Sequence, residues 1–234
     1  MLSEPVKGIF FDAGDTLFET HEAIGVTYSR FAARYGVVCD PHDLDAGFKA
    51  AFRKSGPLAF PNVTDSERKE WEYRWWFRIV RTVFADVSFP SFDLFFKELY
   101  QFFEYGEAWR LFPETREVLE SLAMQRYYLG IISNFDSRLP TICGRLGIAQ
   151  YFRQILFSSK AGYAKPSPKI FDYALKDASL MASETMYVGD HFENDVVGAR
   201  GAGMVPVFIV RSEGEAQRGY SHRIESLRDI QRFL

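Results

Sequence analysis

Short runs of β-branched and apolar residues alternate with segments of helical periodicity, and this alternation constrains the fold more than any other feature of the chain. The runs are VKGIFFD, YYLGIISN, QILFSS, TMYVGD and VPVFIV. The helical segments after the first run are Glu114–Ala123, Ser137–Leu146, Pro168–Ala178 and Asn194–Ala202. Buried strands that alternate with helices form a parallel sheet covered on both faces. Handedness rules then favour a doubly wound, Rossmann-like α/β fold.

A second zone, residues 18–112, shows no strand-like alternation. It predicts four helices, at Glu22–Tyr35, Pro41–Lys54, Asp65–Ala85 and Phe92–Glu104. Asp65 and Ser91 are the expected N-caps of the last two. We therefore predict an all-helical cap domain (18–112) inserted after the first strand, in a core made of residues 1–17 and 113–234.

Charge and composition exclude several classes of function. The 234 residues carry a net charge of −3, which gives no basic footprint for nucleic acid. No apolar stretch approaches the roughly 20 residues that span a bilayer. Two cysteines are too few for a disulfide framework, and MLSEPVKGIFF has no signal-peptide layout. These features predict a cytoplasmic protein that acts on a small molecule, and they leave its oligomeric state open.

Polar residues follow the predicted strands of the core at the points where the strands end. Because ligands bind outside the carboxyl ends of the strands in an open parallel sheet, we expect these residues to converge on one crevice. They are Asp12, Ser133 with Asn134, Lys165, and Asp190 with Asp195.

This set of residue types suits phosphoryl transfer. An aspartate such as Asp12 can attack phosphorus and form an aspartyl-phosphate. A Mg²⁺ ion held by carboxylates would offset the charge of both reactants and needs few protein ligands. Lys165 would add a second positive charge, and Ser133 with neighbouring backbone N–H groups would bind the remaining phosphoryl oxygens.

Taken together, these motifs resemble the haloacid dehalogenase-like (HAD) hydrolase superfamily, in the branch whose helical cap follows the first strand. Asp12 to Thr16 looks like its first motif, Ser133 its second, Lys165 its third and GDHFEND its fourth, so the resemblance covers the whole chain. Asp-Thr-Leu after the first strand, SNFD and the RWW of the cap indicate one subgroup within it.

The resemblance also assigns roles to individual residues. It implies that Asp12, Ser133 and Lys165 are catalytic. It further implies that Thr16 and Asn134 bind substrate. The implied ligands of the metal are Asp12, the carbonyl of Gly14, Asp190 and Asp195.

One position departs from the pattern of the family. The residue two places after the nucleophile is an aspartate that protonates the leaving group and then activates water, but here it is Gly14. Loss of a general acid–base group typically costs a factor of about 10² to 10⁴ in rate. Three compensations are open: a substrate with a good leaving group, replacement of the missing carboxylate by Asp15, or a proton supplied by the substrate or the cap.

The sequence favours a Mg²⁺-dependent phosphatase acting through an aspartyl-phosphate on a small phosphorylated metabolite, with a mobile cap hinged near Phe18–Thr20 and Leu111–Glu114. The alternative is a catalytically weakened protein that binds a phosphorylated ligand or a partner. A haloacid dehalogenase or phosphonate hydrolase comes third. Dehalogenases of the family carry Ser-x-Asn-x-x-Asp in place of GDHFEND, and a phosphonate hydrolase would need a cap lysine, for which Lys54 is the candidate.

A histidine, an aromatic cluster and basic residues of the cap are expected to have mainly structural roles. His191 is a poor ligand for Mg²⁺, which prefers oxygen. The aromatic cluster Trp71–Phe77 is typical of cap packing, with one or two rings that could face the crevice. Lys54, Arg74 and Arg78 are candidate cap contacts for an anion, but a solvated helix face is the simpler expectation for each.

Overall fold

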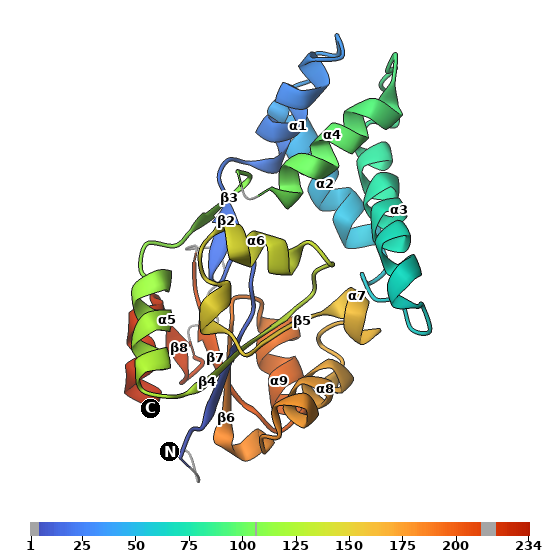
Figure 1. The fold of residues 1–234 in the computed structure, drawn as a ribbon. Coiled ribbons are helices and arrows are strands. Elements are labelled where there is room, and N and C mark those ends of the chain that lie inside the picture. The colour runs from blue at the N-terminus through green and yellow to red at the C-terminus, as the bar shows by residue number, and fades with distance from the viewer. Residues whose placement is uncertain (1–4, 106, 212–218) are drawn as a thin grey trace.

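The computed structural model describes residues 5–105, 107–211 and 219–234, and its centre is a six-stranded parallel sheet (Figure 1). The spatial order is β5-β4-β1-β6-β7-β8. The bounds are β1 (Gly8–Phe11), β4 (Tyr128–Ser133), β5 (Gln154–Phe157), β6 (Thr185–Gly189), β7 (Val205–Ile209) and β8 (Arg223–Ile224). The predicted Rossmann-like sheet is confirmed, and β1 lies in its middle, between β4 and β6.

Helices cover both faces of this sheet, because successive residues of each strand point to opposite sides. Ile9 and Phe11 pack with α5 (Thr115–Met124) and α6 (Leu139–Arg145) on one face. Phe10 packs with α8 (Pro168–Ala178) and α9 (Gly198–Gly201) on the other. The remaining short elements of the core are α7 (Ser158–Ala161), η1 (Ala149–Tyr151), η2 (Ala182–Glu184), the π-helix η3 (Phe192–Val197) and η4 (Leu227–Phe233).

The cap contributes four helices that pack together above the carboxyl ends of the strands (Figure 1). They are α1 (Ile24–Ala33), α2 (Pro41–Lys54), α3 (Asp65–Val83) and α4 (Phe92–Glu104). Aromatic side chains dominate the packing between them: Phe84 lies within 5.2 Å of Phe95, and Tyr73 within 4.8 Å of Phe96, measured between ring centroids. The cap therefore has a hydrophobic core of its own.

The expectation that residues 18–112 contain no strand is wrong at both ends of the segment. Strand β2 (Phe18–Thr20) pairs antiparallel with β3 (Trp109–Leu111), and Phe18 lies opposite Leu111. Three-residue strands are too short to show a period-2 pattern in the sequence. They form because the segment that enters the cap and the segment that leaves it pair through their backbones. Strand β2 coincides with the predicted hinge Phe18–Thr20, whereas β3 shares only Leu111 with the predicted hinge Leu111–Glu114. Both hinges remain predictions, as do the domain boundaries.

Local hydrogen bonds shift several helix ends from their expected positions. Helix α3 is capped by Thr64, whose N–H donates to Glu67 Oε2 at 3.2 Å, so the expected cap at Asp65 is wrong by one residue. Ser91 occupies the N-cap position of α4 as expected, without a side-chain capping bond. Helix α6 begins at Leu139, since Ser137 is bound by a cap residue. Within the described residues, no helix is both long and apolar enough to cross a membrane.

Candidate active site

The carboxyl ends of the three central strands bring the predicted site residues together. Phe11 of β1 is in register with Ile131 of β4 and Val188 of β6, so the residues that follow emerge at one edge. Strand β1 continues into Asp12, whose N–H donates to the carbonyl of Val188 at 2.8 Å. Asp12 is thereby held against the strand that ends at Asp190.

Lys165 is the buried cation of this site. Its ammonium group lies 2.8 Å from Asp12 Oδ1 and 2.6 Å from Asp195 Oδ1, and it donates to the hydroxyl of Tyr187 at 2.9 Å. Burial alone lowers the pKa of Lys165, but the charges of Asp12 and Asp195 outweigh burial and raise the pKa above its usual value. Lys165 is therefore a fixed positive charge beside the candidate nucleophile.

Asp195 is placed by contacts on both of its oxygens. Oδ1 pairs with Lys165, and Oδ2 accepts a hydrogen bond from the N–H of His191 at 2.8 Å. A Cβ at residue 189 would lie 2.3 Å from this carboxylate, so only glycine admits Asp195 there. His191 also accepts a hydrogen bond at Nδ1 from the N–H of Asn194, at 3.2 Å. His191 therefore has a structural role, as the N-cap of η3.

Asp12, Asp190 and Asp195 form an acidic cluster whose ligand oxygens all lie within 4.8 Å of one another. Burial, followed by repulsion from Asp12 and Asp195, raises the pKa of Asp190 to about 8. Burial likewise raises the pKa of Asp195. Asp12 Oδ1 is buried, and its cationic partner among the described residues is the ammonium group of Lys165, 2.8 Å away. The cluster has an excess of negative charge, and a divalent cation that prefers oxygen ligands fits it.

The loop from Asp12 to Thr16 is held by tertiary hydrogen bonds. Thr16 donates to Asp190 Oδ1 at 2.8 Å, and its carbonyl accepts from Arg211, which also forms a 2.6 Å ion pair with Glu114. Asp15 adopts the left-handed conformation, with φ of 54°. The Gly14 carbonyl accepts no hydrogen bond from the described residues, so it is open to a ligand.

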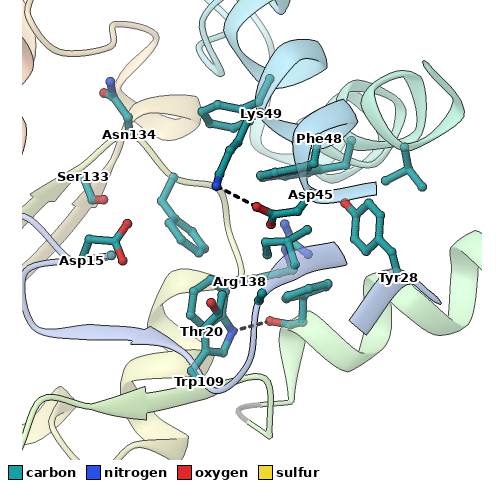
Figure 2. A pocket seen from close by; sticks show the side chains of 18 of the residues that line it. Asp15, Thr20, Tyr28, Asp45, Phe48, Lys49, Trp109, Ser133, Asn134 and Arg138 are labelled. Atoms are coloured by element: carbon teal, nitrogen blue, oxygen red, sulfur yellow. Dashed lines mark hydrogen bonds and ion pairs between the residues drawn. The ribbon is translucent and has the colours of Figure 1, made fainter. Parts of the chain in front are cut away.

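The backbone conformation at Gly14 does not require a glycine. Its φ lies outside the left-handed region, and a Cβ built there meets none of the described residues within 4 Å. The glycine therefore leaves a space beside Asp12 that an L-side chain could fill. Asp15 faces the same cavity from the next position (Figure 2).

Ser133 and Asn134 close β4 as predicted, and they differ in what their side chains do. Ser133 is buried and lines the cavity. Asn134 accepts at Oδ1 from the N–H of Lys165 at 2.7 Å and donates from Nδ2 to the Lys165 carbonyl at 3.0 Å. Asn134 thus positions the loop that carries Lys165, a role that the sequence did not indicate.

Above these residues lies a cavity of about 570 Å³ between the core and the cap. Figure 2 shows Asp15 and Ser133 on one side of it and the cap residues Tyr28, Asp45 and Phe48 on the other. Its aromatic walls come mainly from the cap. Of the Trp71–Phe77 cluster, only Trp76 is among the described residues that line the cavity, and the others pack elsewhere, as expected for most of them.

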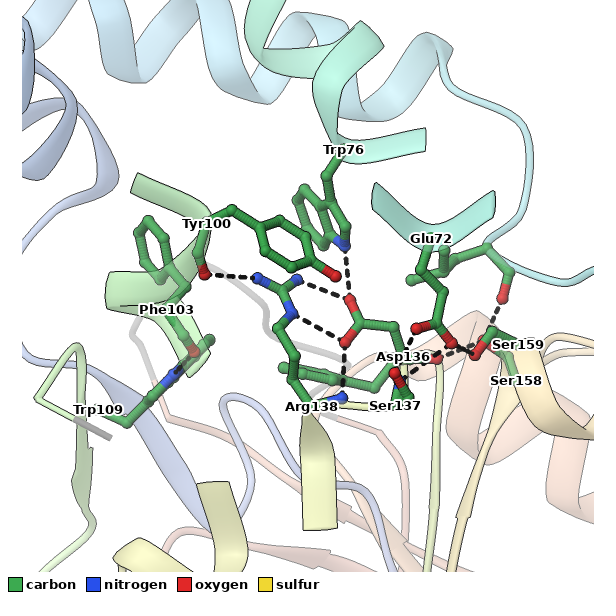
Figure 3. Close-up of polar contacts among 12 residues, drawn as sticks. Glu72, Trp76, Tyr100, Phe103, Trp109, Asp136, Ser137, Arg138, Ser158 and Ser159 are labelled. Atoms are coloured by element: carbon green, nitrogen blue, oxygen red, sulfur yellow. Dashed lines mark hydrogen bonds and ion pairs between the residues drawn. The ribbon is translucent and has the colours of Figure 1, made fainter. Parts of the chain in front are cut away.

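A second polar cluster joins the cap to the core (Figure 3). Asp136, in the SNFD segment, is fully buried, pairs with Arg138 at 2.6 Å and accepts from Trp76 Nε1 at 2.6 Å. Glu72 of α3, also buried, accepts from the N–H of Ser137 at 3.1 Å and from the hydroxyl of Ser159 at 2.5 Å. We name Glu72, Trp76, Asp136, Ser137, Arg138 and Ser159 the cap–core network.

The cap–core network was not predicted as part of the site, although SNFD and RWW were both singled out in the sequence. Their proximity joins segments 60 residues apart, and no periodicity encodes such a pairing. Lys54 and Arg78 line a separate small cavity between α2 and α3, so Lys54 does not face Asp12. Arg74 is exposed and pairs with Glu70, as expected for a solvated face.

Comparison with known proteins places this geometry in a family. A family model described as haloacid dehalogenase-like hydrolase matches residues 6–203. The chain is 30% identical over 214 residues to haloacid dehalogenase-like hydrolase domain-containing protein 3 of Danio rerio, covering 90% of this chain and 88% of that protein.

Among solved structures, similar folds occur in a HAD phosphatase from Thermococcus onnurineus (TM-score 0.70, 21% identity, 97% of each chain) and in a 2-haloacid dehalogenase from Pseudomonas syringae pv. Tomato DC3000 (TM-score 0.66, 26% identity, 97% of each chain). The fold is thus shared by proteins named for two different reactions.

Proposed function

The chain belongs to the haloacid dehalogenase-like hydrolases, and from that premise we propose that it is a Mg²⁺-dependent phosphatase that acts through an aspartyl-phosphate on Asp12. The resemblance predicted from the four motifs is confirmed at the level of the family. The observation that carries the proposed activity is that Lys165 and the acidic cluster, which includes Asp12, lie together beside one cavity.

The proposed metal ligands are the carboxylates of Asp12, Asp190 and Asp195 and the carbonyl of Gly14. An ion bound there supplies positive charge that offsets the repulsion between Asp12 and a phosphate dianion. Lys165 contributes a second positive charge from its fixed position. Ser133 lines the cavity, where its hydroxyl can donate to a phosphoryl oxygen.

In the proposed reaction, a carboxylate oxygen of Asp12 attacks phosphorus, and the bond from phosphorus to the ester oxygen breaks. The electron pair leaves with that oxygen, which takes a proton from solvent. Water then attacks the aspartyl-phosphate, loses a proton, and releases inorganic phosphate with Asp12 restored. Gly14 can neither donate a proton to the leaving oxygen in the first step nor accept one from the attacking water in the second, so both steps are expected to be slow for ordinary alkyl esters.

The other two candidate functions make different use of the same site. A binding protein without turnover would keep the cavity and the charges but release no phosphate. A dehalogenase would not require the acidic cluster, and GDHFEND departs from the dehalogenase form of that motif. A phosphonate hydrolase that uses Lys54 is disfavoured, because Lys54 lines a different cavity.

Phosphate release by the purified protein tests the proposal. The protein should release inorganic phosphate from p-nitrophenyl phosphate with Mg²⁺, lose this activity in EDTA, and show none above background as Asp12→Asn. An absence of release above Asp12→Asn, over a broad panel of phosphate esters, would support the binding alternative. Metal-independent chloride release from 2-chloropropionate would support the dehalogenase.

A further inference from the structure

The cavity above Asp12 is lined chiefly by rings and aliphatic side chains on its cap side. The half-buried or exposed rings there are Phe48, Phe52, Trp76, Tyr100 and Phe103, together with Trp109 from β3. Such walls bind apolar groups by removing them from water and by ring stacking. At about 570 Å³, the cavity has room for a ring system beyond the phosphoryl group.

The charges in the cavity do not favour a second anionic or strongly polar group on the substrate. Among the described residues that line it, the Lys and Arg side chains are Lys49, Arg138 and Lys165. Lys49 lies 2.7 Å from Asp45 (Figure 2), and Arg138 forms a two-bond pair with Asp136 (Figure 3). Lys165 is held by Asp12 and Asp195. No described lining cation is left to neutralise a distal carboxylate or a second phosphate.

The empty space at Gly14 adds an independent constraint on the leaving group. A Cβ at residue 14 would meet none of the described residues within 4 Å, so a side chain could begin there, yet the residue is glycine and offers no general acid. Without a proton donor, an ester of an alkyl alcohol must expel an alkoxide about as basic as hydroxide. A phenol ionises near pH 10, as the tyrosine side chain does, and leaves without protonation.

Resting on the proposed phosphatase function, we propose that the substrate is a phosphate monoester of an apolar aromatic hydroxyl, whose ring occupies the cavity between cap and core. Asp12 takes the phosphoryl group, the bond to the aryl oxygen breaks, and the phenolate leaves with the electron pair and is protonated by water. Hydrolysis of the aspartyl-phosphate still lacks a base at residue 14, so this second step is the slower one. The phosphorylated enzyme therefore accumulates during turnover of an aryl ester.

Four substrates separate the ring from the leaving group. Phenyl phosphate has both a ring and an acidic leaving group, and benzyl phosphate has the ring on an alkyl oxygen. Acetyl phosphate has a good leaving group and no ring, and glycerol 3-phosphate has neither. Rapid-mixing assays with Mg²⁺ follow the burst of leaving group and the acid-stable label on protein from ³²P-labelled esters, with Asp12→Asn as the blank.

Phenyl phosphate should give a burst that approaches one equivalent per active site. Benzyl phosphate should give none and turn over about 10² to 10⁴ times more slowly. Acetyl phosphate should give a burst that half-saturates at a concentration about 10- to 100-fold higher than for phenyl phosphate, since no ring is buried. Glycerol 3-phosphate should be the poorest substrate of the four.

Binding without turnover provides a readout that does not depend on catalysis. Calorimetry should find benzylphosphonate bound about 10- to 100-fold more tightly than methylphosphonate. Phe52→Ala should weaken the binding of benzylphosphonate by about 3- to 10-fold, and a far-UV circular dichroism spectrum like that of the natural protein would show that the variant is folded. Leu94→Ala, an exposed α4 residue that does not line the cavity, is the matched control and should change neither ligand.

Each possible failure has a distinct meaning. Equal half-saturation by phenyl and acetyl phosphate, or equal binding of the two phosphonates, would overturn the apolar part of the inference. A burst with benzyl phosphate as fast as with phenyl phosphate would overturn the leaving-group part. In both cases the phosphatase function would stand. Phosphate release from none of the four substrates above Asp12→Asn would instead overturn the proposed function itself.

Discussion

A Gly14→Asp variant is expected to hydrolyse alkyl phosphates about 10² to 10⁴ times faster than the natural protein, because it restores a proton donor beside Asp12. That gain corresponds to a barrier lower by about 2.7 to 5.4 kcal/mol. The structure permits the change at the backbone: Gly14 is not left-handed, and a Cβ there meets none of the described residues within 4 Å.

The assay compares benzyl phosphate and phenyl phosphate turnover at saturating Mg²⁺. Gly14→Asp should raise the rate for benzyl phosphate towards that for phenyl phosphate. It should also remove the phenyl phosphate burst, since the same carboxylate would activate water for the second step. Gly14→Asn adds almost the same bulk and cannot transfer a proton, so it serves as the matched control.

Two results would refute this reasoning. If Gly14→Asn accelerated benzyl phosphate hydrolysis as much as Gly14→Asp, the effect would be one of packing and not of proton transfer. If a folded, Mg²⁺-binding Gly14→Asp protein showed unchanged or lower rates, the absent carboxylate would not be what limits turnover.

An Asp15→Asn variant tests whether Asp15 replaces the missing acid. A loss of activity much larger than tenfold, relative to the natural protein, would identify Asp15 as the substitute acid.

Three further predictions concern the buried charges. Lys165→Met should lower the free energy of unfolding in EDTA by about 3 to 5 kcal/mol, because it leaves the buried carboxylates of the acidic cluster unpaired. Trp76→Phe should cost about 1.5 to 3 kcal/mol, since the buried charge of Asp136 loses a donor. Burial, followed by repulsion from Asp136, raises the pKa of Glu72 in the folded protein. The contribution of Glu72 to stability therefore falls as the pH rises from the pKa of the unfolded state through the raised pKa of the folded state. Glu72→Gln should reduce that fall.

Urea unfolding provides the measurement for all three. Lys165→Met is compared in EDTA with Lys160→Met, an exposed lysine of α7, and equal stability of the two variants would contradict the buried-charge argument. Trp71→Phe, an exposed tryptophan of the same helix, is the control for Trp76→Phe and should be nearly neutral. For Glu72, the free energies of unfolding of the natural protein and of Glu72→Gln are compared from pH 4.5 to 8. The natural protein should become less stable relative to Glu72→Gln as the pH rises, and the absence of this trend would contradict the argument.

Local patterns in the chain were sufficient to predict the sheet and most of the polar residues at its edge. Alternating strands and helices specify a parallel sheet, and in such a sheet each strand delivers whatever follows it to the same edge. The proximity of Asp12, Ser133 and Asp190 could therefore be predicted from the sequence, because each directly ends or follows a strand. Their neighbourhood depends on strand order alone.

Only the tertiary structure decided the contacts between cap and core and the space around Gly14. Trp76 meets Asp136 across 60 residues, and Ser159 meets Glu72 across 87, and no helical or strand period links positions so far apart. The room beside Gly14 likewise depends on how neighbouring segments pack, which the sequence pattern does not state. Periodicity encodes which face of an element is buried, but the partner on that face is chosen when the elements pack together.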